Sequence, residues 1–193
     1  MDTKKLTGFI YEMSSLRPLL REHRRQLMTN DNTDTIAAHS HLVTGIGYVL
    51  AQMAELALEE RYRLLVMCLF HDLGETRTGD IDWTGKLYLK AFDDEVAQAQ
   101  LGSLPFSEPK EFAEEYKTRS SVVAQLAKDA DTLAQIVLLR EYAQIAGNKT
   151  AQHWLDERRN TQLYTEVAKE LCVELCNQDP TDWRKDLWTN KNR

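Results

Sequence analysis

Residues 64–81 read LLVMCLFHDLGETRTGDI, an almost fully apolar run followed directly by a histidine and an aspartate. Such a run is typical of a buried helix, which we expect over about residues 58–73 at the centre of the fold. The ETRT at residues 75–78 lies between two glycines and is predicted to be a loop. His71 and Asp72 therefore stand where a buried helix opens into a loop, and both are residue types that bind metal ions.

The rest of the chain repeats apolar residues at three- and four-residue steps, and no segment alternates as a half-buried strand does. Eight glycines and four prolines are few for 193 residues, which favours long helices. The sequence predicts an all-α fold, one compact multi-helix bundle over residues 1–193, in which Pro18 bends or divides the first helix. The expected helices span about residues 6–20, 34–53, 58–73, 88–101, 120–146, 150–158 and 161–176, with a further helix that begins after Ser107.

The composition excludes several classes of protein. Lys and Arg number 24 against 30 Asp and Glu, and a net charge of −6 is unlike that of a protein that binds duplex nucleic acid. No run of about 18 apolar residues is present, so we expect no membrane span, and the N-terminal residues lack the features of a signal peptide. Three cysteines, an odd number, indicate reduced thiols, so we expect a cytoplasmic protein.

Four residues of metal-binding type lie on apolar helix faces, namely His39, His71, Asp72 and Asp131. Asp131 lies within an apolar stripe, where a carboxylate without a partner is strongly destabilising. Two imidazoles and two carboxylates form a mixed set that suits a borderline divalent ion and leaves coordination positions open for water and substrate. The four residues together, in this order on different helices, predict a metal site.

These residue types also have structural interpretations. An isolated buried histidine is more often hydrogen-bonded than metal-bound, and Asp131 alone could cap a helix or pair with Lys128 or Arg140. Cys172 and Cys176 are one helical turn apart and could bind a metal only with further ligands nearby, so core packing is favoured for them.

The order His39, His71-Asp72, Asp131 resembles the H…HD…D signature of the HD superfamily of metal-dependent phosphohydrolases. The branch of this superfamily that contains the 5′-deoxynucleotidases carries the pattern HDxxExxxGDI. Residues 71–81, HDLGETRTGDI, match that pattern.

Two further segments resemble the same branch. Residues 114–133, EEYKTRSSVVAQLAKDADTL, resemble the segment before its last metal ligand, and residues 23–40, HRRQLMTNDNTDTIAAHS, resemble its approach to the first histidine. The resemblance covers about residues 16–142, the expected motif-bearing core of a single HD domain. We expect C-terminal helices over about residues 150–178 and a polar tail over residues 179–193.

The resemblance implies a cofactor and an activity. His39, His71, Asp72 and Asp131 would hold one divalent ion, which could be Mn, Co, Fe, Ni, Zn or Mg. Asp72 would share in catalysis with Glu75, which would help to activate the attacking water or the leaving group. The implied substrate is a small phosphorylated metabolite, in the first place a deoxynucleoside 5′-monophosphate.

The resemblance also implies substrate-binding residues. Arg24 would hold the phosphate, and Asp80 would meet the sugar hydroxyl, although Asp80 could also serve only to form a turn. Arg25 stands where the branch commonly has a tryptophan, and a second arginine there favours a substrate with more phosphate charge. One alternative is therefore a nucleotide di- or triphosphate hydrolase. A separate alternative is a non-catalytic nucleotide-binding HD protein. The arginines could also form only a basic, solvated face.

Four other candidate ligands lack support from the motif. His23, His41, Asp129 and His153 are expected to lie at the surface or beside the ligands without binding the metal.

The resemblance further implies a homodimer, and the apolar C-terminal helices with Trp154, Trp183 and Trp188 leave surface for its interface. Light scattering is therefore expected to give twice the mass of the chain. A monomer mass at every working concentration would reject this prediction.

Overall fold

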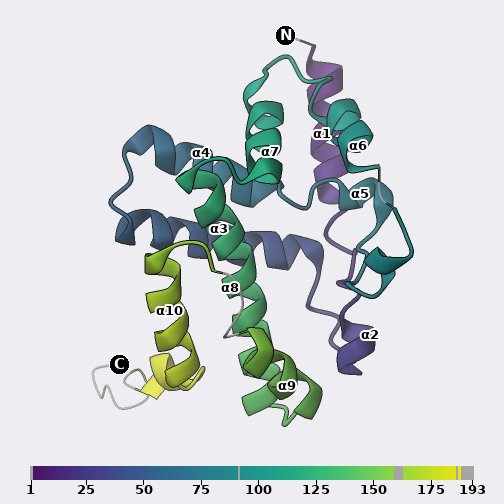
Figure 1. Cartoon of the computed structure of the whole chain (residues 1–193). Coiled ribbons are helices and arrows are strands. Elements are labelled where there is room, and N and C mark those ends of the chain that lie inside the picture. Colours follow the sequence, from purple (N-terminus) through teal and green to yellow (C-terminus); the bar gives the residue numbers. More distant parts are fainter. Residues whose placement is uncertain (1, 91, 159–162, 186, 188–193) are drawn as a thin grey trace.

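The computed structural model describes residues 2–90, 92–158, 163–185 and 187. Over these residues the chain is α-helical, and its strand-like pairing is limited to one bridge between Leu20 and Thr35. The all-α prediction is confirmed. The elements, labelled in part in Figure 1, are α1 (Thr3–Ser14), α2 (Arg24–Leu27), α3 (Ile36–Met53), α4 (Leu58–Phe70), α5 (Glu75–Thr78), the 3₁₀ turn η1 (Gly85–Leu87), α6 (Asp93–Gln100), α7 (Glu108–Thr118), α8 (Val122–Gln144), α9 (Lys149–Arg158), α10 (Glu166–Asn177) and the 3₁₀ turn η2 (Asp182–Arg184).

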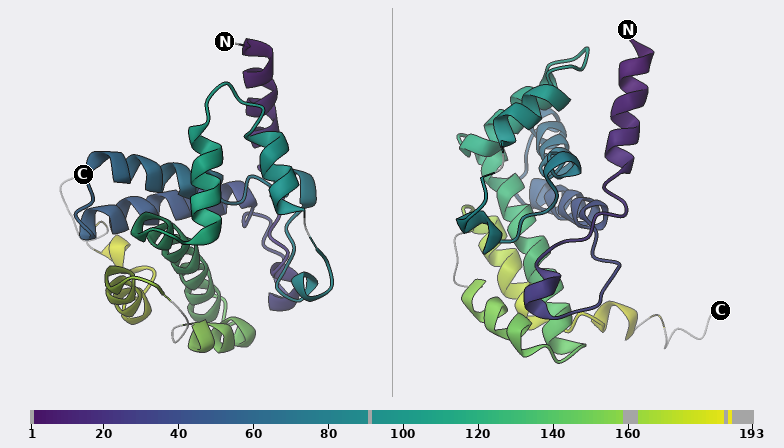
Figure 2. Two further views of the ribbon diagram at one scale, coloured as in Figure 1. Left: turned by 45° about the horizontal axis from the view of Figure 1, so that its top comes forward. Right: turned by 90° about the vertical axis from the view of Figure 1, so that its right-hand side faces the viewer.

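The long helix α8 lies at the centre of the bundle, where α3, α4, α7, α9 and α10 all contact it (Figures 1 and 2). Its buried residues are Val123, Ala124, Leu126, Ala127, Asp129, Ala130, Leu133, Ala134, Ile136 and Leu139. Helix α4, which the apolar run predicted to be central, buries only Leu64, Met67 and Cys68. That prediction is wrong because the apolar residues of α4 surround the helix, so that some, such as Leu69, face outward.

Helices α3 and α4 approach each other closely at Gly47. A Cβ atom added to Gly47 would lie 2.7 Å from Sγ of Cys68, so the missing side chain is what allows this approach. The start of α3 is fixed by Thr35, whose Oγ1 accepts a hydrogen bond of 3.1 Å from the backbone N–H of Ala38. These two features set the position of His39, in the first turns of α3, relative to the end of α4.

Several elements differ from their predicted bounds, among them α4, which ends at Phe70 rather than near residue 73. Helix α1 ends at Ser14 rather than near residue 20, because Pro18 lacks a backbone N–H and disfavours helical geometry in the residue before it. Residues 75–78 form the short helix α5 instead of a loop. The backbone N–H groups of Arg77 and Thr78 donate to the carbonyl of Gly74 at 3.0 and 3.3 Å.

Other predicted bounds agree more closely. Ser107 precedes α7, although its side chain makes no capping hydrogen bond, and α8 is followed by Gly147 in the left-handed region with a φ of +65°. Helix α6 begins at Asp93, later than expected, where acidic side chains fill its first turn. The start of the last predicted helix, residue 161, and Trp188 lie outside the described residues.

Among the described helices, none has both the length and the apolar character needed to cross a bilayer.

Two polar residues expected at the surface or beside the site are buried structural residues. Asp129 is fully buried and accepts hydrogen bonds from the backbone N–H groups of Tyr164 and Thr165, at 2.8 and 2.9 Å, and from Oγ1 of Thr165 at 2.6 Å. It thereby ties α8 to the start of α10. His23 is also buried and lies 2.8 Å from the carboxylate of Asp34.

Replacing Asp129 by alanine is expected to lower the free energy of unfolding by about 2–4 kcal/mol, because two buried backbone N–H groups would lose their acceptor. Urea denaturation measures this change. The matched control is Glu114→Ala, which removes an exposed carboxylate and should change stability by less than about 0.5 kcal/mol. An equal, small effect of both substitutions would contradict the structural role of Asp129.

Candidate metal centre

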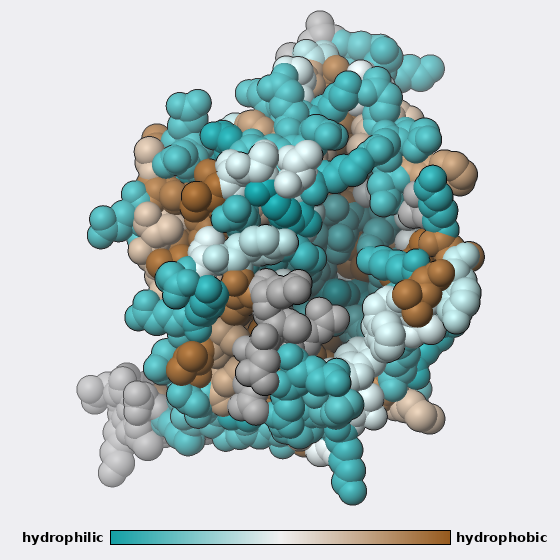
Figure 3. All heavy atoms as spheres, in the orientation of Figure 1, coloured by the Kyte–Doolittle hydropathy of each residue, from teal (hydrophilic) through white to brown (hydrophobic). Residues whose placement is uncertain are grey.

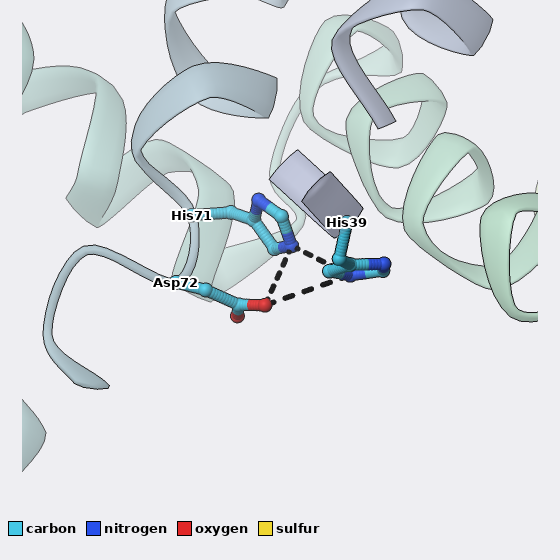
Figure 4. A group of neighbouring side chains, drawn as sticks. All are labelled: His39, His71 and Asp72. Carbon is cyan, nitrogen blue, oxygen red and sulfur yellow. Dashed lines mark hydrogen bonds and ion pairs between the residues drawn. The ribbon is translucent and has the colours of Figure 1, made fainter. Parts of the chain in front are cut away.

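Three helices bring the predicted metal ligands together. His39 comes from α3, His71 and Asp72 directly follow α4, and Asp131 lies in the middle of α8. Figure 4 shows His39, His71 and Asp72 pointing toward one another. One ligand atom from each of these three residues lies within 4.8 Å of the others, so the group could hold a metal ion.

The distances within this group are short. The Nε2 atoms of His39 and His71 lie 3.3 Å apart, and Oδ2 of Asp72 lies 3.0 Å from Nε2 of His71 and 3.6 Å from Nε2 of His39. Nδ1 of His71 lies 2.9 Å from the carbonyl oxygen of Cys68 and, when protonated, donates to it. That tautomer leaves Nε2 of His71 without a proton and directed at the group, as a metal ligand requires.

Asp131, the fourth predicted ligand, lies beside both histidines. Its Oδ1 lies 3.1 Å from Nε2 of His39 and 3.8 Å from Nε2 of His71. Its Oδ2 accepts a hydrogen bond of 2.6 Å from Nζ of Lys128. The pairing of Asp131 with Lys128, which the sequence left open, therefore occurs. It uses Oδ2, whereas Oδ1 is the oxygen beside His39. Arg140 instead donates to the carbonyl of Gln178 at 3.2 Å.

Burial and charge at the site favour a cation. The imidazole side chains are 3% and 2% exposed and the carboxylates 24% and 18%. Burial lowers the pKa of His39, which favours its neutral form. Burial opposes ionisation of Asp131, but the bond with His39 and the charge of Lys128 outweigh it and hold the pKa of Asp131 well below its usual value. Neutral imidazole nitrogens beside ionised carboxylates are the donor set of a divalent metal site, so these residues fit one.

For His71, burial alone would lower the pKa, but the neighbouring carboxylate of Asp72 outweighs it and raises that pKa. A bound cation would favour the neutral ring, because a metal ion and a proton compete for the same nitrogen.

Glu75 lies in α5, three residues after Asp72. Its Oε2 is buried and has no hydrogen-bond partner among the described residues. Burial, with the negative charges of Asp72 and Asp80, raises the pKa of Glu75 to about 9, while Arg21 and Lys86 act in the opposite direction. This environment favours the protonated form of Glu75, which can donate a proton.

The predicted substrate-binding residues have different surroundings. Oδ2 of Asp80 accepts a hydrogen bond of 2.6 Å from the backbone N–H of Glu22. Nε of Arg24 is buried and has no hydrogen-bond partner among the described residues. The side chain of Arg25 is 66% exposed, and its guanidinium pairs with Glu22 at 2.7 Å and with Asp82 at 3.3 Å. The direct roles proposed for these three residues stay predictions.

An open cleft of about 1570 Å³ reaches the site. His71, Asp72 and Glu75 line it, together with residues of α7, among them Tyr116, and with Arg119 after α7. Arg24, Arg25 and Asp80 do not line this cleft. The face of the molecule drawn in Figure 3 is largely hydrophilic and is hollowed near its middle.

The two remaining histidines lie apart from the group, as predicted. His41 is exposed, and His153 is exposed on α9 and lies 3.4 Å from Glu157.

Sequence reasoning missed two arginines near the site. The charge of Arg21 lowers the pKa of both His39 and Glu75. In the sequence, Arg21 was one of four neighbouring arginines, and no pattern singled it out. Arg119 lies on the cleft wall after α7, and only its place in the EEYKTRSS segment pointed toward the site.

Comparisons with known proteins agree on the architecture. The family model for the HD domain matches residues 14–171. A structural-genomics protein superimposes with a TM-score of 0.76 at 24% identity, over 94% of this chain and 99% of its own. A protein from Pyrococcus horikoshii OT3 superimposes with a TM-score of 0.71 at 26% sequence identity, over 88% of this chain and 98% of its own. A Magnetospirillum magnetotacticum MS-1 protein, described as a predicted metal-dependent phosphohydrolase, superimposes with a TM-score of 0.60. Its sequence identity to this chain is 21%, and the match covers 90% of each chain. Among curated proteins, none matches this chain.

His39→Ala is expected to weaken Mn²⁺ binding by more than about 100-fold, because even residues that only orient metal ligands commonly contribute 10–100-fold. Isothermal titration calorimetry with Mn²⁺ measures this change. His41→Ala is the matched control, since His41 lies two residues away and is exposed. Binding by His39→Ala that equals binding by His41→Ala would show that the group is structural.

Proposed function

The chain belongs to the HD domain family, and from this premise we propose that it is a metal-dependent phosphohydrolase. The observation that carries the proposal is the convergence of two imidazoles and two carboxylates beside Glu75, whose buried Oε2 has no hydrogen-bond partner among the described residues, at an open cleft. The description of the Magnetospirillum protein as a predicted metal-dependent phosphohydrolase supports the same activity.

The residues divide into two roles. His39, His71, Asp72 and Asp131 would hold a divalent ion, with Nε2 of each histidine and one oxygen of each carboxylate as donors. When bound, such an ion lowers the pKa of water and neutralises the charge of a phosphoryl group. Lys128 holds the second oxygen of Asp131, which keeps that carboxylate ionised and oriented.

Glu75 would transfer a proton during hydrolysis. Among the described residues, its buried Oε2 has no hydrogen-bond partner to compete with a substrate or a water molecule. Because burial favours its protonated form, Glu75 can donate its proton to the leaving oxygen as the ester bond breaks. The Glu75 carboxylate formed by this transfer can then accept a proton from water.

We further propose that the substrate is a nucleotide, in the first place a deoxynucleoside 5′-monophosphate. The match of residues 71–81 to the 5′-deoxynucleotidase branch supports it, with Arg24 for the phosphate and Asp80 for the sugar. The di- or triphosphate alternative relied on a second free arginine. The pairing of Arg25 with Glu22 and Asp82 removes much of that support.

A panel of nucleoside and deoxynucleoside 5′-mono-, di- and triphosphates tests the proposal. Release of inorganic phosphate from deoxynucleoside monophosphates is expected, with loss of activity in EDTA and recovery on adding a divalent ion. Pyrophosphate release from triphosphates would favour the alternative hydrolase. The absence of any product at every metal tested would favour a non-catalytic binding protein.

Glu75→Gln is expected to lower kcat by about 10²–10⁴-fold, because the amide cannot donate and accept the proton as the carboxyl group does. Mn²⁺ affinity should stay unchanged, since Glu75 is not in the ligand set, and calorimetry beside steady-state kinetics separates the two effects. A variant that keeps its kcat, or one that loses metal and activity together, would contradict a role in proton transfer.

A further inference from the structure

Arg119 has an unusual backbone conformation at the end of α7. Its φ of +55° lies in the left-handed region, which is uncommon for residues other than glycine, asparagine and aspartate. Its carbonyl oxygen accepts a weak hydrogen bond of 3.4 Å from Nε2 of Gln125, at the start of α8. An uncommon conformation held in place beside a cleft is a reason to examine the side chain for a function.

The guanidinium of Arg119 stacks on an aromatic ring that contacts the metal centre. Its Cζ lies 3.8 Å from the centroid of the Tyr116 ring. The Tyr116 ring packs edge-to-face against His71, with 5.9 Å between the ring centroids. One aromatic ring therefore separates this cation from a predicted metal ligand.

Among the described residues, the charged neighbours of Arg119 on α7 have other partners. Glu115, the nearest acidic residue along α7, pairs with Arg63 and accepts a hydrogen bond from Ser121. Lys117, the other cation in this turn of α7, pairs with Asp94. Nη1 of Arg119 is buried and has no hydrogen-bond partner among the described residues. A buried donor on a charged group without an acceptor is costly, and an anionic ligand would supply the acceptor.

Arg119 lines the same cleft as Asp72 and Glu75. The planar N–H groups of a guanidinium held over an aromatic ring can form paired hydrogen bonds to phosphate or carboxylate oxygens. We propose that Arg119 is a substrate-binding residue that holds a phosphoryl oxygen of the substrate in this cleft. The identity of this anion rests on the proposed phosphohydrolase function.

Binding of inorganic phosphate to the Mn²⁺-loaded protein, measured by calorimetry, tests the proposal without relying on turnover. Arg119→Gln is expected to weaken phosphate binding by roughly 10- to 100-fold, the range for loss of charge-assisted hydrogen bonds. Arg119→Lys keeps the charge but not the planar pair of donors, so it should recover only part of the affinity. Lys117→Gln, which removes a cation already paired with Asp94, should bind phosphate as the unchanged protein does.

Two further measurements separate direct contact from an effect through Tyr116. Mn²⁺ affinity and the midpoint of thermal unfolding should be the same in Arg119→Gln as in the unchanged protein. A fall in Mn²⁺ affinity as large as the fall in phosphate affinity would mean that Arg119 only supports His71, and would overturn the proposal. If Arg119→Gln fails to fold, Arg119→Lys decides the matter by the same two measurements.

The outcomes also separate this proposal from the proposed function. Hydrolysis by the unchanged protein, with equal phosphate affinity and equal KM in Arg119→Gln, would overturn the role of Arg119 and leave the hydrolase intact. Phosphate binding that depends on Arg119, in a protein that hydrolyses no member of the panel, would support the anion site and reject the hydrolase. No phosphate binding by the unchanged protein would overturn the role of Arg119.

Discussion

Ring nitrogens and carboxylate oxygens face one another across 3.0–3.8 Å where α3, the end of α4 and α8 meet. Without a cation, these groups depend on protons held between the imidazoles and the carboxylates, and the carboxylate charges lose hydration. The architecture holds them there nevertheless. The missing side chain of Gly47 brings α3 against α4, and the carbonyl of Cys68 orients His71. The core around α8 thus fixes the position of the donors before any ligand binds, which lowers the entropy that binding must overcome.

The sequence predicted those parts of the fold that depend on local pattern. The apolar stripe of α8, the glycine that follows it and the break near Pro18 follow from backbone rules that act within a few residues. The predicted metal ligands followed from polar residues on apolar helix faces, which need partners, and from the H…HD…D order. The sequence failed where the outcome depends on tertiary contacts. Which of two apolar helices is central is decided by how many neighbours each one meets.

The candidate site shows the same division. His39, His71, Asp72 and Asp131 could be named from their residue types on apolar faces and from the resemblance to the HD signature. The pairing of Arg25 with Asp82 instead joins residues 57 apart in the sequence. The contact of Arg119 with Tyr116 spans only three residues, but no motif marks it. The role of Arg25 in binding phosphate was inferred only because an arginine stands where the branch commonly has a tryptophan. Its exposure and its ion pairs depend on the loop that carries Asp82, and nothing in residues 23–40 specifies that loop.

Asp129 and Asp131 stand two residues apart on α8 and serve different parts of the molecule, one bonded to the start of α10 and the other facing His39. Detachment of α10 would leave the buried charge of Asp129 without its donors, in the same helical turn that carries Asp131. The C-terminal helix is therefore not an independent appendage but belongs to one cooperative unit with α8. Amide hydrogens in α10 should exchange with solvent at rates set by the opening of that whole unit, and occupancy of the metal centre should slow exchange in a helix that contributes no ligand to it.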